Sequence, residues 1–160
     1  MTLENAAQLA PIATAIIAFT AACVALKSMY LQRDVARRRA AIDFFMKTDV
    51  DSNMAEMYRN YKKHTDDLDA LMRTKDFHKT QPYYEIKHYL SICELICVGI
   101  NHGAFSERVS LAYWGNWLPS VYRTTRPLIT FIRQTPGEGR VNTYIELERV
   151  CKRWEPEDCR

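Results

Sequence analysis

The chain has 160 residues, 22 of them lysine or arginine and 19 aspartate or glutamate, so its formal net charge is +3. That length fits one small domain with room for an appendage. A hydrophobic content of 48% and a charged content of 26% exclude global disorder, and five glycines and six prolines are too few for a collagenous or low-complexity chain.

The first pattern along the chain is an apolar run at residues 9–26, LAPIATAIIAFTAACVAL, which contains no charged side chain. As a helix, 18 residues span about 27 Å, close to the roughly 30 Å hydrocarbon core of a bilayer. Pro11 suits the first helical turn, and the hydroxyl groups of Thr14 and Thr20 can bond to the preceding turn. The alternative is a buried core helix. We expect a transmembrane helix at residues 9–26, after a short extracytoplasmic tail at residues 1–8.

The positive charge of the chain is concentrated directly after this run. Residues 1–41 carry five basic and two acidic side chains, which leaves residues 42–160 neutral overall. By the positive-inside rule, the N-terminus is expected outside and the C-terminal body in the cytoplasm. A cleaved signal peptide is disfavoured because no basic residue precedes the run. The basic residues expected at the membrane interface are Lys27, Arg33, Arg37, Arg38 and Arg39.

The rest of the chain is typical of an all-α protein. No helix breaker occurs at residues 27–48, so the membrane helix is expected to continue as a basic juxtamembrane helix. A loop and a helix N-cap are predicted at Asp49, Asp51, Ser52 and Asn53. Residues 49–160 are expected to form a small cytosolic helical bundle. A strongly apolar helix is expected to open at Pro82 and to end at Gly103. Its predicted core face is Ile86, Tyr89, Leu90, Cys93, Ile96, Cys97 and Ile100.

Three further boundaries follow from breakers and caps. A helix is expected to start at Ser106 and to run through Trp117 until Pro119 interrupts or kinks it. Pro127 is expected to open the next helix, and Asn142 to cap the last one.

No pattern in the sequence indicates catalysis or a cofactor. Cys93 and Cys97 are four residues apart on one helix face, but a structural zinc site needs a second close pair, so buried thiols are favoured over a metal site. His88 could form an acid–base pair with Glu85 or with Glu94, although any helical protein offers such pairs. Phosphate-binding loops, nucleophile elbows and zinc-protease motifs are missing. We therefore expect neither an enzyme, nor a cofactor, nor a metal site.

One stretch combines arginines with aromatic residues. Between Arg108 and Arg140 there are five arginines and no lysine, interleaved with tyrosine, tryptophan and phenylalanine. Guanidinium groups suit phosphates and aromatic faces suit bases. The alternative is that the aromatic residues lie in the core and the arginines on a solvated face. The predicted ligand-binding residues are Arg108, Trp117, Tyr122, Arg123, Arg126 and Arg133.

The order of these features resembles an uncharacterised bacterial and phage-encoded family, domain of unknown function 4760. The segments that carry the resemblance are residues 38–45, RRAAIDFF, residues 89–105, YLSICELICVGINHGAF, and residues 146–154, ELERVCKRW. The family implies one N-terminal span, a basic stalk and a small helical domain, here in a bacterial inner membrane, and no catalytic residues. The architecture is also similar to single-span membrane effectors of type III CRISPR systems, which sense cyclic oligoadenylate.

The sequence therefore leaves two alternative functions. The first is an antiviral membrane effector whose body binds a nucleotide signal, with cyclic oligoadenylate the suggested ligand. The alternative is a membrane-tethered protein–protein interaction module, which an exposed apolar groove and dispersed arginines would favour. Both have the bilayer as a partner and neither binds duplex nucleic acid. Small residues such as Ala18 and Ala22 on the span permit a homo-oligomer, for which a tetramer is suggested.

Overall fold

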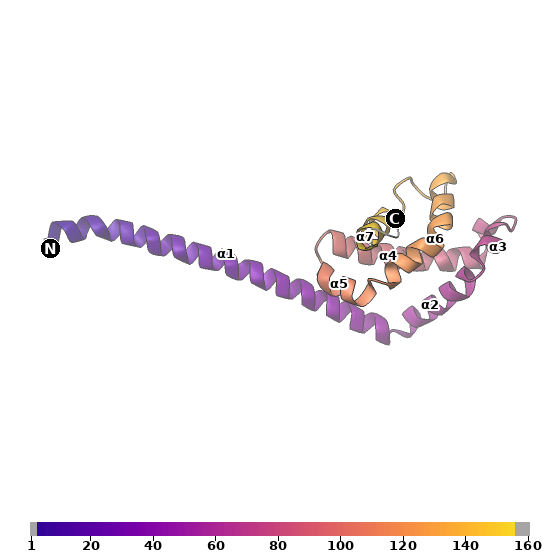
Figure 1. Cartoon of the computed structure of the whole chain (residues 1–160), viewed down its shortest axis with the longest axis horizontal. Coiled ribbons are helices and arrows are strands. Elements are labelled where there is room, and N and C mark those ends of the chain that lie inside the picture. The colour runs from indigo at the N-terminus through magenta and orange to yellow at the C-terminus, as the bar shows by residue number, and fades with distance from the viewer. Residues whose placement is uncertain (1–2, 156–160) are drawn as a thin grey trace. The chain divides into compact units, whose positions relative to one another are not determined.

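The computed structural model describes residues 3–155, with side chains from residue 11 onward. All regular secondary structure in this part of the chain is helical, which confirms the predicted all-α class (Figure 1). The elements in chain order are α1 (Leu3–Val50), α2 (Ser52–Thr65), α3 (Leu68–Met72), a 3₁₀ turn (Phe77–Lys79), α4 (Gln81–Asn101), α5 (Glu107–Trp114), α6 (Trp117–Gln134) and α7 (Ile145–Trp154).

The chain divides into two compact units, Met1–Arg37 and Arg38–Arg160, with the division inside α1. The helix from Pro11 to Val50 contains an apolar window long enough to cross a membrane, and none of that window is buried. Thr20 donates its hydroxyl to the carbonyl oxygens of Ile16 at 3.0 Å and Ile17 at 2.9 Å, as predicted. The helix continues without a break through the predicted juxtamembrane segment, residues 27–48. Residues 27–37 of this segment belong to the first unit and residues 38–48 to the second. Residues 1–2 of the predicted tail lie outside the described residues.

The second unit begins with the last turns of α1. Ala41 and Phe45 are buried there, so this end of the helix belongs to the core. A single residue, Asp51, separates α1 from α2, and its carboxylate accepts a hydrogen bond from the Asn53 N–H at 2.8 Å. The sequence predicts an N-cap among these residues, but the predicted loop is shorter than expected, because α1 runs through Asp49 and leaves only Asp51 between the helices.

Helix α4 is the central element of the second unit, and α2 and α7 pack against it (Figure 1). It begins and ends as predicted, with Pro82 in its first turn and Gly103 at a φ of 70° just after it. All seven residues of its predicted core face are buried. Gly99 allows the Phe105 ring to lie against the helix, because a Cβ atom there would be 2.6 Å from two ring atoms.

The predicted boundaries around α5 and α6 are wrong. Helix α5 ends at Trp114, two residues link it to α6, and α6 then runs unbroken from Trp117 to Gln134. Pro119 therefore lies in the first turn, where its missing N–H costs nothing, and it does not interrupt a helix. Pro127 lies inside α6 and does not open a helix.

The predicted cap of α7 is also wrong. The helix begins at Ile145, and Asn142 lies in the preceding turn. Its first turn is capped from α4, because the Glu94 carboxylate accepts hydrogen bonds from the N–H groups of Glu146 at 3.1 Å and Leu147 at 2.7 Å. Burial raises the pKa of the Glu94 carboxyl above its ordinary value, although these two hydrogen bonds act in the opposite direction.

Candidate functional site

Five aromatic rings of the second unit line a cavity of about 410 Å³, which we call the aromatic pocket. It is bounded by the last turn of α1 and by α2, α4, α5 and α6. The lining residues are Thr48, Asp49, Met54, Ala55, Tyr58, Tyr89, Ile96, Tyr113, Trp114 and Trp117.

The five rings of the aromatic pocket form a row in the order Tyr58, Tyr89, Trp117, Trp114 and Tyr113. Successive ring centroids are 6.0, 5.8, 6.1 and 5.6 Å apart. These separations are typical of offset and edge-to-face aromatic pairs. Such pairs stabilise a fold by more than the burial of their apolar area alone. Tyr89 and Trp114 are buried, whereas Tyr58 and Tyr113 are 39% and 45% exposed, so the ends of the row meet solvent.

Asp49 is the only lining residue of the aromatic pocket that is charged at neutral pH. Its carboxylate accepts a hydrogen bond from the Tyr113 hydroxyl. That hydrogen bond, followed by burial, raises the pKa of Tyr113 to about 12, so this hydroxyl keeps its proton at any physiological pH. The pocket therefore combines aromatic surface with one negative charge and no positive one.

The structure does not assemble the predicted arginine site. Arg133 donates from Nε to the Thr143 carbonyl oxygen at 2.8 Å and from Nη1 to Glu148 at 2.7 Å, so it joins α6 to the start of α7. Tyr122 is buried in the core, and Trp117 faces the aromatic pocket. Arg126 is exposed on α6.

The two remaining arginines lie on other surfaces. Arg108 is exposed on α5, and Arg123 lines a second hollow of about 470 Å³ together with Trp117 and Trp154. Glu155 lines the same hollow and lies 3.5 Å from the Arg123 guanidinium group. Arg123 is in the middle of α6, so the break predicted between Pro119 and Pro127 does not occur there.

An apolar patch lies on the outside of the second unit where α1 ends. Ile42, Met46 and Val50 follow one another at four-residue spacing on α1 and are 46%, 65% and 85% exposed. Ile42 and Met46 also line a hollow of about 310 Å³ together with Val109, Ala112 and Tyr113 of α5. We call the exposed residues Ile42, Met46, Val50, Ala112 and Tyr113 the α1–α5 patch.

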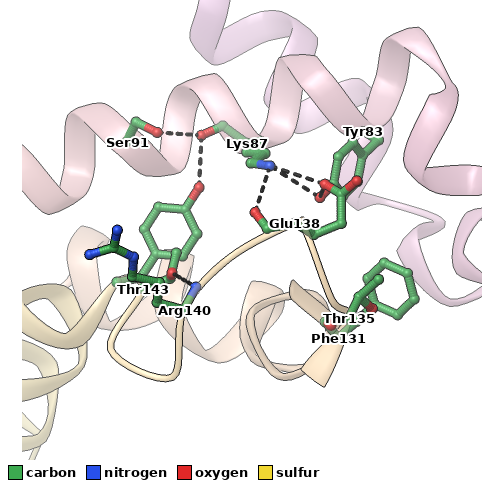
Figure 2. Close-up of polar contacts among 9 residues, drawn as sticks. Tyr83, Lys87, Ser91, Phe131, Thr135, Glu138, Arg140 and Thr143 are labelled. Atoms are coloured by element: carbon green, nitrogen blue, oxygen red, sulfur yellow. Dashed lines mark hydrogen bonds and ion pairs between the residues drawn. The ribbon is translucent and has the colours of Figure 1, made fainter. Parts of the chain in front are cut away.

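The loop between α6 and α7 is fixed to α4 by polar contacts. Lys87 donates from Nζ to the carboxylate and to the carbonyl oxygen of Glu138, each at 3.1 Å (Figure 2). The Tyr83 hydroxyl donates to the same carboxylate, and these contacts lower the pKa of Glu138. This network holds the loop between α6 and α7 against α4.

Glu85, which the sequence suggested as an acid–base partner of His88, contacts His64 instead. Glu85 lies 2.7 Å from His64 Nε2 of α2 and accepts a second hydrogen bond from Gln81, while His88 is exposed. Cys93 and Cys97 are buried free thiols, and burial raises the pKa of both. The described residues contain no group of three or more ligands that could hold a metal ion.

The five predicted membrane-interface residues all lie on α1, on both sides of the division between the units. Lys27 and Arg33 are exposed in the first unit, where Arg37 is half-exposed, and Arg38 and Arg39 are exposed at the start of the second.

Comparison with protein-family models gives one match, a domain of unknown function, DUF4760, over residues 14–154. The chain belongs to this family. The match covers most of the exposed apolar helix as well as the helical unit, so both parts are features of the family. Neither the curated proteins nor the solved structures contain a match to this chain. The DUF4760 description names no activity, so functional conclusions depend on the geometry of the sites.

Proposed function

We propose that this DUF4760 protein is a membrane-anchored interaction module, held in the bilayer by α1, whose helical unit docks on a second copy of the same chain. The α1–α5 patch is the observation that carries the proposal. The second unit has a complete core of its own, so apolar side chains left outside it are available for another surface.

The membrane anchor favours a second copy as the partner. Chains inserted in one bilayer share an orientation and diffuse in two dimensions, which raises their effective concentration for one another. A patch on the continuation of the anchor helix then meets the same patch of its neighbour, as in closed symmetric assemblies. In the first unit, Ala18 and Ala22 are exposed at the spacing that lets membrane helices approach closely.

The proposed topology places the N-terminus outside the bacterial inner membrane and the helical unit in the cytoplasm. It is supported by the five basic residues that follow the apolar run. A reporter fused after the last residue should be active only on the cytoplasmic side, and periplasmic activity would refute this orientation.

The docking surface is tested by the mass of the full chain in maltoside micelles. The parent chain should be a homo-oligomer, and Met46→Glu should shift it toward monomer because a carboxylate would have to be desolvated in the contact. Leu95→Glu is the matched control, since Leu95 is 63% exposed on α4, outside the patch. A monomeric parent chain, or equal effects of the two variants, would refute the proposal.

A second candidate is the nucleotide-sensing effector, and the hollow that Arg123 shares with Trp117 and Trp154 favours it. A guanidinium group beside two indole rings suits a phosphate next to a base. The other predicted residues do not converge there, and the Glu155 carboxylate competes for Arg123. Cyclic oligoadenylate should raise the melting temperature of the full chain by several degrees if this candidate is correct, and Arg123→Ala should abolish that rise. An unchanged melting temperature would exclude it.

A further inference from the structure

The aromatic pocket shares Tyr113 with the α1–α5 patch, but the rest of its lining lies outside that patch, and its chemistry indicates a ligand of its own. We propose that it binds an organic cation of the quaternary ammonium class, such as choline. Five aromatic rings and one carboxylate, Asp49, line the pocket, and this is the combination that recognises such cations.

The charge of the pocket lining favours a cationic ligand over an anionic one. Asp49 supplies a negative charge, and the lining contains no lysine, arginine or histidine. An anion would meet repulsion from Asp49 without a compensating donor charge, so a phosphate ligand is disfavoured in this pocket.

The size and rigidity of the pocket select an organic cation over a metal ion. A cavity of about 410 Å³ lies in the range of small-molecule sites. One carboxylate is too few protein ligands for Ca²⁺ or Mg²⁺, which take six or more oxygen atoms, and the lining contains no histidine or cysteine for Zn²⁺. Tyr89 and Trp114 are held by the core, so the rings need little ordering when the ligand enters.

Asp49 links the aromatic pocket to α1, the helix that carries the candidate membrane span. Thr48 and Asp49 belong to the last turn of α1, whereas the other lining residues belong to the helices of the body. A bound cation would therefore contact both the end of the anchor helix and the body, and should stabilise their packing within the second unit.

The test is a titration of the full chain in maltoside micelles, which contain no choline group, followed by tryptophan fluorescence. Trp114 and Trp117 line the pocket and report on it, while Trp154 does not. Choline and tetramethylammonium should give a saturable change. The neutral carbon isostere of choline, 3,3-dimethylbutan-1-ol, should bind about 10-fold more weakly because it lacks the charge.

Two variants with matched controls locate the binding. Asp49→Asn should weaken choline about 10-fold, whereas Asp43→Asn, an exposed carboxylate of the same helix outside the pocket, should not. Tyr58→Leu should also weaken choline, and Tyr84→Leu, an exposed ring outside the pocket, should not. Absence of a saturable change with both cations, equal binding of the neutral isostere, or equal effects of variant and control would overturn the proposal. Because Met46 does not line the pocket, Met46→Glu should retain choline binding even where it abolishes docking.

Discussion

Replacing Glu94 by alanine should destabilise the second unit more than any other exchange of a single carboxylate outside the aromatic pocket. Glu94 holds the first turn of α7 through hydrogen bonds of 3.1 and 2.7 Å to two backbone N–H groups. Each hydrogen bond to a charged group contributes about 1.5–3 kcal/mol. The raised pKa of Glu94 means that burial of the carboxylate offsets part of this gain, and water can reach the N–H groups of this half-buried site. A net loss of about 2 kcal/mol remains, similar to the loss of a strong helix cap.

For a unit of this size, a loss of that magnitude lowers the melting temperature by roughly 8 °C. The assay is thermal unfolding of the full chain in maltoside micelles, followed by tryptophan fluorescence, because all three tryptophans belong to the second unit. Glu94→Gln keeps one acceptor oxygen and removes the buried charge, so it should cost less than half as much. Glu56→Ala, an exposed carboxylate of α2, should cost nothing measurable. The reasoning fails if Glu94→Ala matches the Glu56 control or if Gln is as damaging as Ala.

Three further predictions concern the same unit and the same melting assay. Arg133→Met should lower the melting temperature by several degrees because it breaks the contacts to Glu148 and Thr143, whereas Arg126→Met on the exposed face should not; equal values for the two would contradict the structure. The pKa of Glu138 is lowered by its contacts with Tyr83 and Lys87, so its stabilising contribution is complete above the ordinary value of 4.5 and is lost as the pH falls through the lower folded value. Glu138→Gln should therefore lower the melting temperature at pH 7 and flatten its fall between about pH 5 and 3, and an unchanged slope would refute this. Gly99→Ala should destabilise the unit by overpacking against the Phe105 ring, and Phe105→Leu in the same chain should restore part of the loss; no loss in the single variant would show that the ring yields freely.

The elements with the strongest local signals could be predicted from the sequence. The apolar run, the Asp51 cap and the face of α4 each depend on residues within one or two turns of one another. The errors arise where the decisive partner is distant or where a breaker is tolerated. Glu94 caps α7 from a helix 52 residues earlier, and no local pattern at Asn142 could reveal it. Pro119 is harmless because α6 begins two residues before it.

The contrast between local signals and distant partners also explains why the sequence predicted an arginine–aromatic site and not the aromatic pocket. In the sequence, Tyr113, Trp114 and Trp117 belong to the stretch between Arg108 and Arg140, and the sequence analysis associated its aromatic residues with the arginines beside them in the chain. In the fold, these rings face Asp49, Tyr58 and Tyr89, which come from other helices. Burial orients large aromatic side chains inward and leaves arginines such as Arg126 on the outside of the same helix, although Arg123 still shares a hollow with Trp117. The sign of the charge next to the rings was therefore not predictable from the sequence.

The central claim, docking of one copy on another through the α1–α5 patch, is tested most directly by photo-crosslinking in native membranes. A photoreactive phenylalanine analogue at position 46 should capture a second copy of the chain as a covalent dimer. The same analogue at position 95, an exposed position on α4, should give no dimer. Absence of the dimer at position 46, or equal yields at both positions, would contradict the account.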